Sequence, residues 1–149
     1  MVELLIVILI ISILAGLILL VSTSGLESAE ATRILNDLRN IKTAAFMYYA
    51  DQGSWPDATA AGGSSVATAS IDRYMDRSLD TSRYGEVEIG AELNNRQFIG
   101  FALKPPINNV NVQRKILSRA KDSGIFGSST GGDFAVVAPD NAAVFMNMR

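Results

Sequence analysis

The chain has 149 residues, which is enough for one domain with a buried core but too few for two independent catalytic domains. Its 13 Lys and Arg residues against 15 Asp and Glu residues give a net charge of −2, without the basic character that nucleic-acid-binding domains usually have. It contains no histidine and no cysteine, which excludes imidazole bases, thiol nucleophiles, soft-metal sites and disulfides. Serine, threonine, lysine or carboxylate chemistry remains possible, but no motif supports it, so we expect no catalytic residues, no cofactor and no metal, and a protein that is not an enzyme. A membrane-anchored enzyme and a receptor anchor are the alternatives from other classes.

The apolar residues are concentrated at the start of the chain. From Leu4 to Val21 the sequence reads LLIVILIISILAGLILLV, with Ser12 as its only polar side chain. As a helix, this stretch is about 27 Å long, close to the thickness of the hydrocarbon core of a bilayer. A helix that is apolar on every side needs lipid or other apolar helices around it. Arg33 is the first cation of the chain, so the basic region that precedes the core of a signal peptide is missing.

Glu3 is the exception within this apolar segment. A carboxylate at the start of a membrane-embedded helix costs a few kcal/mol unless it is paired. Because the first 32 residues contain no Lys or Arg, the available cation is an α-amino group, either that of the same chain or that of another copy. The positive end of the helix dipole also favours Glu3 in the first turn. The alternative is a hydrated glutamate at the level of the lipid headgroups.

The segment from Met1 to Gly16, MVELLIVILIISILAG, resembles the N-terminal segment of bacterial type IV pilins and of the related pseudopilins of type II secretion. That family segment begins with Phe and a Thr-like residue ahead of the stretch that matches Met1, so we expect this sequence to start at the third residue of the usual mature N-terminus. The resemblance implies that Glu3 pairs with the N-terminal amine of a neighbouring subunit.

The resemblance also implies two successive locations for the protein, the inner membrane and a filament on the cell surface. It implies a monomer held in the inner membrane, processing by prepilin peptidase, methylation, and polymerisation by the pilus assembly machinery into a helical filament, or fimbrium, on the cell surface. Adhesion, motility, DNA uptake and conduction all stay open as roles of that filament, and the net charge disfavours nucleic acid as a partner without excluding it. The residues expected to act in assembly are Glu3, Leu4, Leu5, Ile8, Ser12 and Gly16.

Two alternatives concern the family and the helix. A pseudopilin is the other candidate, but the calcium-binding loop of major pseudopilins, acidic and containing Trp, has no counterpart near the C-terminus, since Trp55 is the only tryptophan.

Many pilins have Gly where this chain has Ser12 and Pro where it has Leu20. Without that Pro, unwinding of the helix near Ser12 to Gly16 is less strongly encoded, and a continuous helix stays compatible with the sequence.

An amphipathic pattern follows the apolar segment. Apolar residues recur with the 3–4 spacing of one helical stripe, at Ala31, Ile34, Leu38, Ile41, Ala45 and Tyr48. We predict one helix from about residue 2 to Asp51, ended by Gly53 and Pro56. We expect Glu30 and Asp37 to lie off the stripe, and Glu30 to pair locally with Arg33. The residues expected to pack the helix against the rest of the protein are Ile34, Leu38, Ile41, Ala45, Tyr48 and Trp55.

The remaining sequence predicts a small head. We expect a loop over 57–70, with Ser64, Ser65, Thr68 and Ser70 as candidate glycan sites, and a short helix over 71–79. Strands are predicted around Val87 and Ile89 and over 98–103, and a hairpin over 134–138 and 142–146. A helix over 112–121, capped by Asn109 or Asn111 and ended by Gly124, is expected to bury its apolar residues Val112, Ile116, Leu117 and Ala120.

The basic residues of that second helix are Arg114, Lys115, Arg119 and Lys121. We interpret them as a solvated face balanced by Asp122 and by Asp72, Asp76 and Asp80 of a neighbouring copy, the alternative being a patch for DNA or another anionic surface. The Gly-rich stretch 124–132 is interpreted as a flexible connection.

The predicted fold class is α+β, with a long N-terminal helix packed against an antiparallel sheet of about four strands. The expected division is an apolar transmembrane or filament-core helix over 1–24 and a head over 25–149. The head would comprise the second half of the helix (25–52), a connecting loop (53–85), and the sheet with the second helix (86–149).

Overall fold

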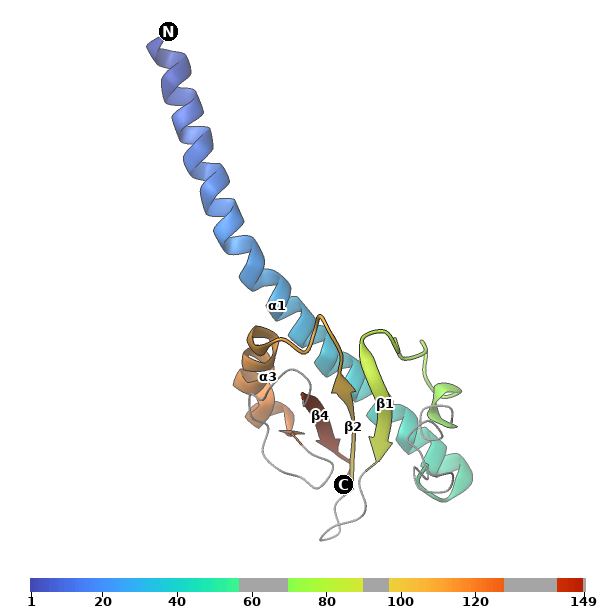
Figure 1. Ribbon diagram of the computed structural model, residues 1–149. Helices are drawn as coiled ribbons and strands as arrows, with labels where there is room; N and C mark the ends of the chain where they lie inside the picture. Colours follow the sequence, from blue (N-terminus) through green and yellow to red (C-terminus); the bar gives the residue numbers. More distant parts are fainter. Residues whose placement is uncertain (57–69, 90–96, 128–141, 149) are drawn as a thin grey trace.

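The computed structural model describes residues 1–56, 70–89, 97–127 and 142–148, without the side chains of 19–24 and 121. Helix α1 (Val2–Gln52) is continuous, and its first half extends beyond the rest of the molecule (Figure 1). It ends where the sequence predicts, because Gly53 adopts a left-handed conformation with φ of 71° and its N–H donates to the carbonyl of Tyr49. The helix does not unwind between Ser12 and Gly16.

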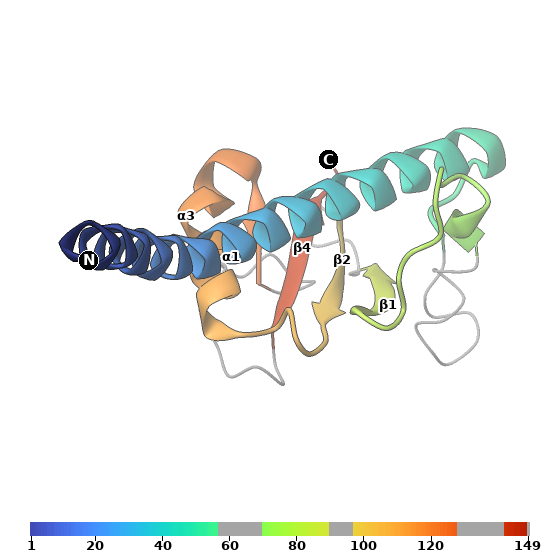
Figure 2. The ribbon, with the colours of Figure 1, turned by 90° about the horizontal axis from the view of Figure 1, so that it is seen from above.

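The head is built on a four-stranded sheet. Its strands, in the spatial order β1-β2-β4-β3, are antiparallel throughout: β1 (Tyr84–Ile89), β2 (Phe98–Leu103), β4 (Ala143–Asn147) and β3 (Ile125–Phe126). The second half of α1 lies across one face of this sheet, and α3 (Val110–Ser123) lies beside α1 at one end of the head (Figure 2). The α+β class and the antiparallel sheet are as predicted.

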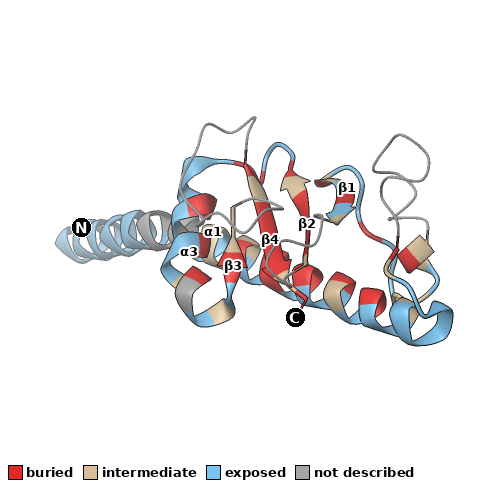
Figure 3. Ribbon diagram, turned by 90° about the horizontal axis from the view of Figure 1, so that it is seen from below, coloured by how far each residue is buried: buried red, intermediate tan, exposed pale blue. Residues whose placement is uncertain are grey.

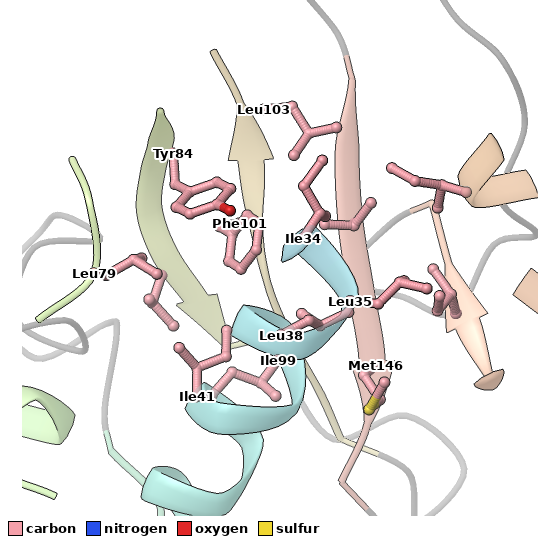
Figure 4. Close-up of a cluster of buried hydrophobic side chains, with 14 of the residues drawn as sticks. Ile34, Leu35, Leu38, Ile41, Leu79, Tyr84, Ile99, Phe101, Leu103 and Met146 are labelled. Atoms are coloured by element: carbon pink, nitrogen blue, oxygen red, sulfur yellow. The ribbon is translucent and has the colours of Figure 1, made fainter. Parts of the chain in front are cut away.

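The core lies between α1 and the sheet. Ile34, Leu38, Ile41 and Ala45 are fully buried, and buried residues follow the sheet side of α1 (Figure 3). They belong to one buried cluster with side chains from all four strands, part of which is drawn in Figure 4. The strand residues of this core include Tyr84, Val87, Ile99, Phe101, Leu103, Val144 and Met146. The 3–4 stripe in the sequence therefore becomes the face of α1 that packs on the sheet.

Helix α3 begins at its predicted cap. The side chain of Asn109 accepts a hydrogen bond from the backbone N–H of Val112 at 2.9 Å, and Gly124 ends the helix in a left-handed conformation. Leu117, however, was expected inside and is 42% exposed, although Ile116 is fully buried. The inward face of α3 is narrow because this helix packs beside α1 at the edge of the head rather than beneath it.

Other expectations for the head need correction. Within 71–79 only the first two residues are helical, continuing from residue 70, and turns and bends follow; Ile71 and Leu79 are nevertheless buried as expected. Strand β1 begins two residues before position 86. Ile125 and Phe126, assigned to a flexible connection, form β3, because they pair with Met146 and Phe145 at the edge of β4.

Two expectations fall on residues outside the described ranges. They are the loop over 57–69, with the candidate glycan sites Ser64, Ser65 and Thr68, and the first strand of the hairpin, 134–138.

The centre of the sheet depends on a glycine. Gly100 of β2 lies opposite Phe145 of β4. A Cβ atom at Gly100 would lie 2.0 Å from the carbonyl oxygen of Val144 and 2.7 Å from the Cα of Phe145. Both atoms belong to the backbone, so neither can move without moving β4 away from β2.

We expect Gly100→Ala to destabilise the protein by about 3 kcal/mol, since overpacking against a backbone displaces a strand. The matched control is Gly25→Ala in α1, where nothing lies within 4 Å of the new Cβ and helix propensity predicts a gain of about 1 kcal/mol. Urea unfolding of the full-length protein in detergent, followed by circular dichroism, measures both changes. An unchanged midpoint for Gly100→Ala would contradict the close approach of β2 and β4.

Candidate functional site

The first half of α1 carries a large uncovered apolar surface. In residues 2–18, which we call the stem, each of the thirteen large apolar side chains is 50% to 70% exposed. None of the head residues that the structure describes covers these side chains, and every side of the helix is apolar. Soluble monomers rarely expose contiguous apolar patches of more than a few hundred Å². The stem is therefore an apolar surface larger than soluble monomers usually leave open to water.

Among the residues that the structure describes, no helix reaches the length and apolar character required to cross a membrane.

Five of the six residues expected to act in assembly lie on one face of the stem, where Leu4 and Leu5 are four and three residues before Ile8. Leu5, Ile8, Ser12 and Gly16 follow each other at intervals of three or four residues, and all are exposed. The hydroxyl of Ser12 donates to the carbonyl of Ile8 at 2.7 Å, so its polar group is satisfied within the helix. A Cβ at Gly16 would meet nothing within 4 Å. Ser12 and Gly16 form a pair of small residues four apart, which allows a second helix to approach closely.

Glu3 lies away from that face, exposed in the first turn of α1. Glu3 has no hydrogen bond or ion pair with any described residue. The nearest cationic side chain along the helix, Arg33, is 30 positions away, or about 45 Å. A side-chain partner for Glu3 is therefore out of reach on its own helix.

Polar contacts attach the head to α1. Glu30 pairs with Arg83, which precedes β1, and not with Arg33 as expected. On the other side of the head, Arg119 of α3 donates to the hydroxyl oxygens of Ser28 and Thr32 at 2.9 and 2.8 Å. These contacts come from opposite edges of the sheet, so they fix how the head is oriented around α1.

Asp37 is a further attachment point that the sequence reasoning placed wrongly. It was expected off the stripe but is only 7% exposed. Its carboxylate accepts the hydroxyl hydrogen of Tyr84 at 2.7 Å and a hydrogen from Arg77 at 3.3 Å, and the Arg33 guanidinium lies 3.9 Å away. Burial, reinforced by the hydrogen bond to Asp37 and its negative charge, raises the pKa of Tyr84. The sequence did contain a signal for this burial: Asp37 follows the buried Ile34 by three residues, which places both on the same face of the helix.

Aromatic side chains cover the C-terminal end of α1. Trp55 is half-buried and stacks on Tyr49, with ring centroids 4.5 Å apart, while the ring of Phe46 meets it edge-on at 5.5 Å. Tyr48 is also half-buried and contacts Tyr74 edge-on at 5.9 Å. Both expected packing residues of this region thus lie at the rim of the core.

The described residues offer little to a metal ion, since no group of three or more Asp and Glu side chains among them has a suitable arrangement. Their acidic side chains at Glu30 and Asp37 are instead engaged with arginines.

No protein-family model matches the sequence, and no curated protein matches it either. A solved structure does match: that of the major type IV pilin PilA1 from Clostridium difficile, with a TM-score of 0.59 over 84% of this chain and 98% of that one. The chain has the type IV pilin fold. The two sequences are 19% identical, so the likeness lies in the architecture of a long helix laid across an antiparallel sheet.

We expect Tyr84→Phe to destabilise the protein by about 1–3 kcal/mol, because the buried Asp37 carboxylate would lose a hydrogen-bond donor. Tyr74→Phe is the matched control: its hydroxyl also donates to a carboxylate, that of Asp51 at 2.6 Å, but in an exposed position, so little change is expected. Equal unfolding midpoints for the two variants would contradict a structural role for the buried pair.

Proposed function

We propose that this chain is a structural subunit of a type IV pilus, which polymerises through its stem into a helical filament on the cell surface. The observation that carries the proposal is the apolar surface of the stem, which is exposed on every side. The pilin fold of the whole chain supports it. In a filament of this kind, the uncovered side chains of one stem are covered by the stems of neighbouring copies.

We place the unassembled subunit in the inner membrane, where lipid covers the stem. The sequence from Leu4 to Val21, apolar except for Ser12, supports this part of the proposal. Exchange of lipid for other stems has little hydrophobic driving force, because both surroundings are apolar, so packing decides the outcome. The small residues Ser12 and Gly16 favour such packing. Prepilin peptidase and the pilus assembly machinery are the partners that this route requires.

Glu3 would set the register of assembly by pairing with the N-terminal amine of a neighbouring copy. An unpaired carboxylate among apolar stems is penalised by several kcal/mol. A subunit therefore docks stably only where an amine meets Glu3. At any other position along the filament, Glu3 would be buried without a partner, and this penalty makes the docking position specific. The lack of a partner for Glu3 among the described residues of its own chain agrees with a partner from another copy.

We expect Glu3→Ala to leave the protein in the membrane fraction but to lower the yield of filaments about tenfold or more, since losing 1.4 kcal/mol of pairing free energy suffices for a factor of ten. The measurement is electron microscopy and immunoblotting of sheared surface fractions. Glu86→Ala is the matched control, because Glu86 is an exposed glutamate of β1 far from the stem.

Filaments of normal yield from Glu3→Ala would remove the role of Glu3. If the unaltered protein forms long filaments only when overproduced, and none at native levels, the pseudopilin alternative replaces the pilus. If it forms none under either condition, the polymerisation itself is refuted.

A further inference from the structure

We propose that neighbouring copies also dock through their heads, with the exposed face of α3 in one copy seated in the groove between α1 and residues 74–80 of the next. This inference rests on the proposed function, because it describes a second contact within the same filament. It assigns Leu117 and Arg114 to one side of the contact and Asp76 to the other.

The groove is a cavity of about 340 Å³ between the middle of α1 and the segment 74–80. Its apolar part comes from Met47, which is 51% exposed, and from Met75 and Leu79. Flexible methionine side chains adapt to an inserted apolar group. The groove therefore offers an apolar floor that no described residue of its own chain covers completely.

The charged side chains at the rim of the groove that have no ion-pair partner among the described residues are acidic. Asp76 is exposed and has no hydrogen bond or ion pair with a described residue. Asp80 is also exposed, and its hydrogen bonds from Ser82 lower its pKa, so it is ionised at neutral pH. Arg77, the cation of the rim, is engaged with Asp37 at 3.3 Å. A cation from outside would therefore find an open carboxylate at Asp76.

The outer face of α3 has the complementary composition. Leu117 is 42% exposed although it belongs to a well-packed helix. Arg114 is exposed three residues earlier, so it lies next to Leu117 on the same face. Arg114 has no ion-pair partner among the described residues. An apolar side chain flanked by a free cation matches an apolar groove flanked by a free carboxylate.

The two surfaces lie at different places on the head, as a growing filament requires. Figures 1 and 2 place α3 and the segment 70–80 at opposite sides of the head. Helix α3 contacts α1 near Ser28 and Thr32, whereas the groove lies beside Asn40 to Met47. The difference is about 12 residues, or about 18 Å along the axis of α1. Copies staggered along that axis would bring one surface to the other, and such a heterologous contact repeats without closing.

A nucleic acid is a less suitable occupant of the α3 face. Leu117 would gain nothing from a phosphate backbone, and no aromatic side chain interleaves with the cations of α3. A second copy accounts for both the apolar and the charged residue.

The test is a charge exchange in full-length protein expressed in cells. We expect Arg114→Asp and Asp76→Arg each to lower the filament yield about fivefold or more, through like-charge repulsion across the contact, and the double variant to return it to within about twofold of the unaltered protein. Leu117→Asp should lower the yield as well. Glu86→Arg, a reversal on exposed β1, is the control and should have no effect. Thermal unfolding in detergent should be unchanged in the charge-reversal variants, because Arg114, Asp76 and Glu86 are all exposed.

Failure of this inference differs from failure of the proposed function. If the unaltered protein forms filaments and the single reversals do so equally well, or if the double variant does not recover, the head contact is wrong and the stem-based filament stands. If Arg114→Asp lowers DNA binding by the filaments while their yield is unchanged, the α3 face serves nucleic acid instead. If the unaltered protein forms no filaments, the proposed function itself has failed.

Discussion

The apolar surface of the stem is the constraint on which the rest of the molecule depends. Helix α1 is one continuous element with two apolar surfaces, of which the fold buries only one. The surface of its second half is buried by the sheet, whereas the described residues of the head leave the stem uncovered. The hydrophobic effect therefore stabilises the head within one chain, and in the stem it favours whatever surroundings exclude water. Both lipid and sister stems meet that requirement.

The polar contacts along the second half of α1 fix the orientation of the head on the helix. The pairs Glu30–Arg83 and Asp37–Tyr84 join the helix to the region that opens β1, while Arg119 joins it to α3. A buried carboxylate such as Asp37 is costly unless its lone pairs are satisfied, so these contacts admit few orientations of the head. A head held rigidly on the helix transmits the position of the stem to the outer surface of an assembly.

Local signals explain which parts of the structure the sequence predicted. The length of α1, its end at Gly53 and the cap at Asn109 follow from helical periodicity and backbone chemistry, which act over a few residues. The burial of Asp37 and the exposure of Leu117 depend on which elements lie opposite, and β3 exists because β4 offers it an edge. Such choices are made by residues distant in the sequence, so no local pattern records them. In the stem, the sequence predicted a helix that is apolar on every side and carries one carboxylate, and the structure leaves that surface exposed.

A helical reconstruction of the assembled filament tests the central claim most directly. The account predicts that residues 2–18 of each copy lie along the filament axis, with their large apolar side chains in contact with the stems of other copies and away from solvent. A reconstruction in which the stems lie at the outer surface, or in which the heads alone hold the copies together, would contradict it.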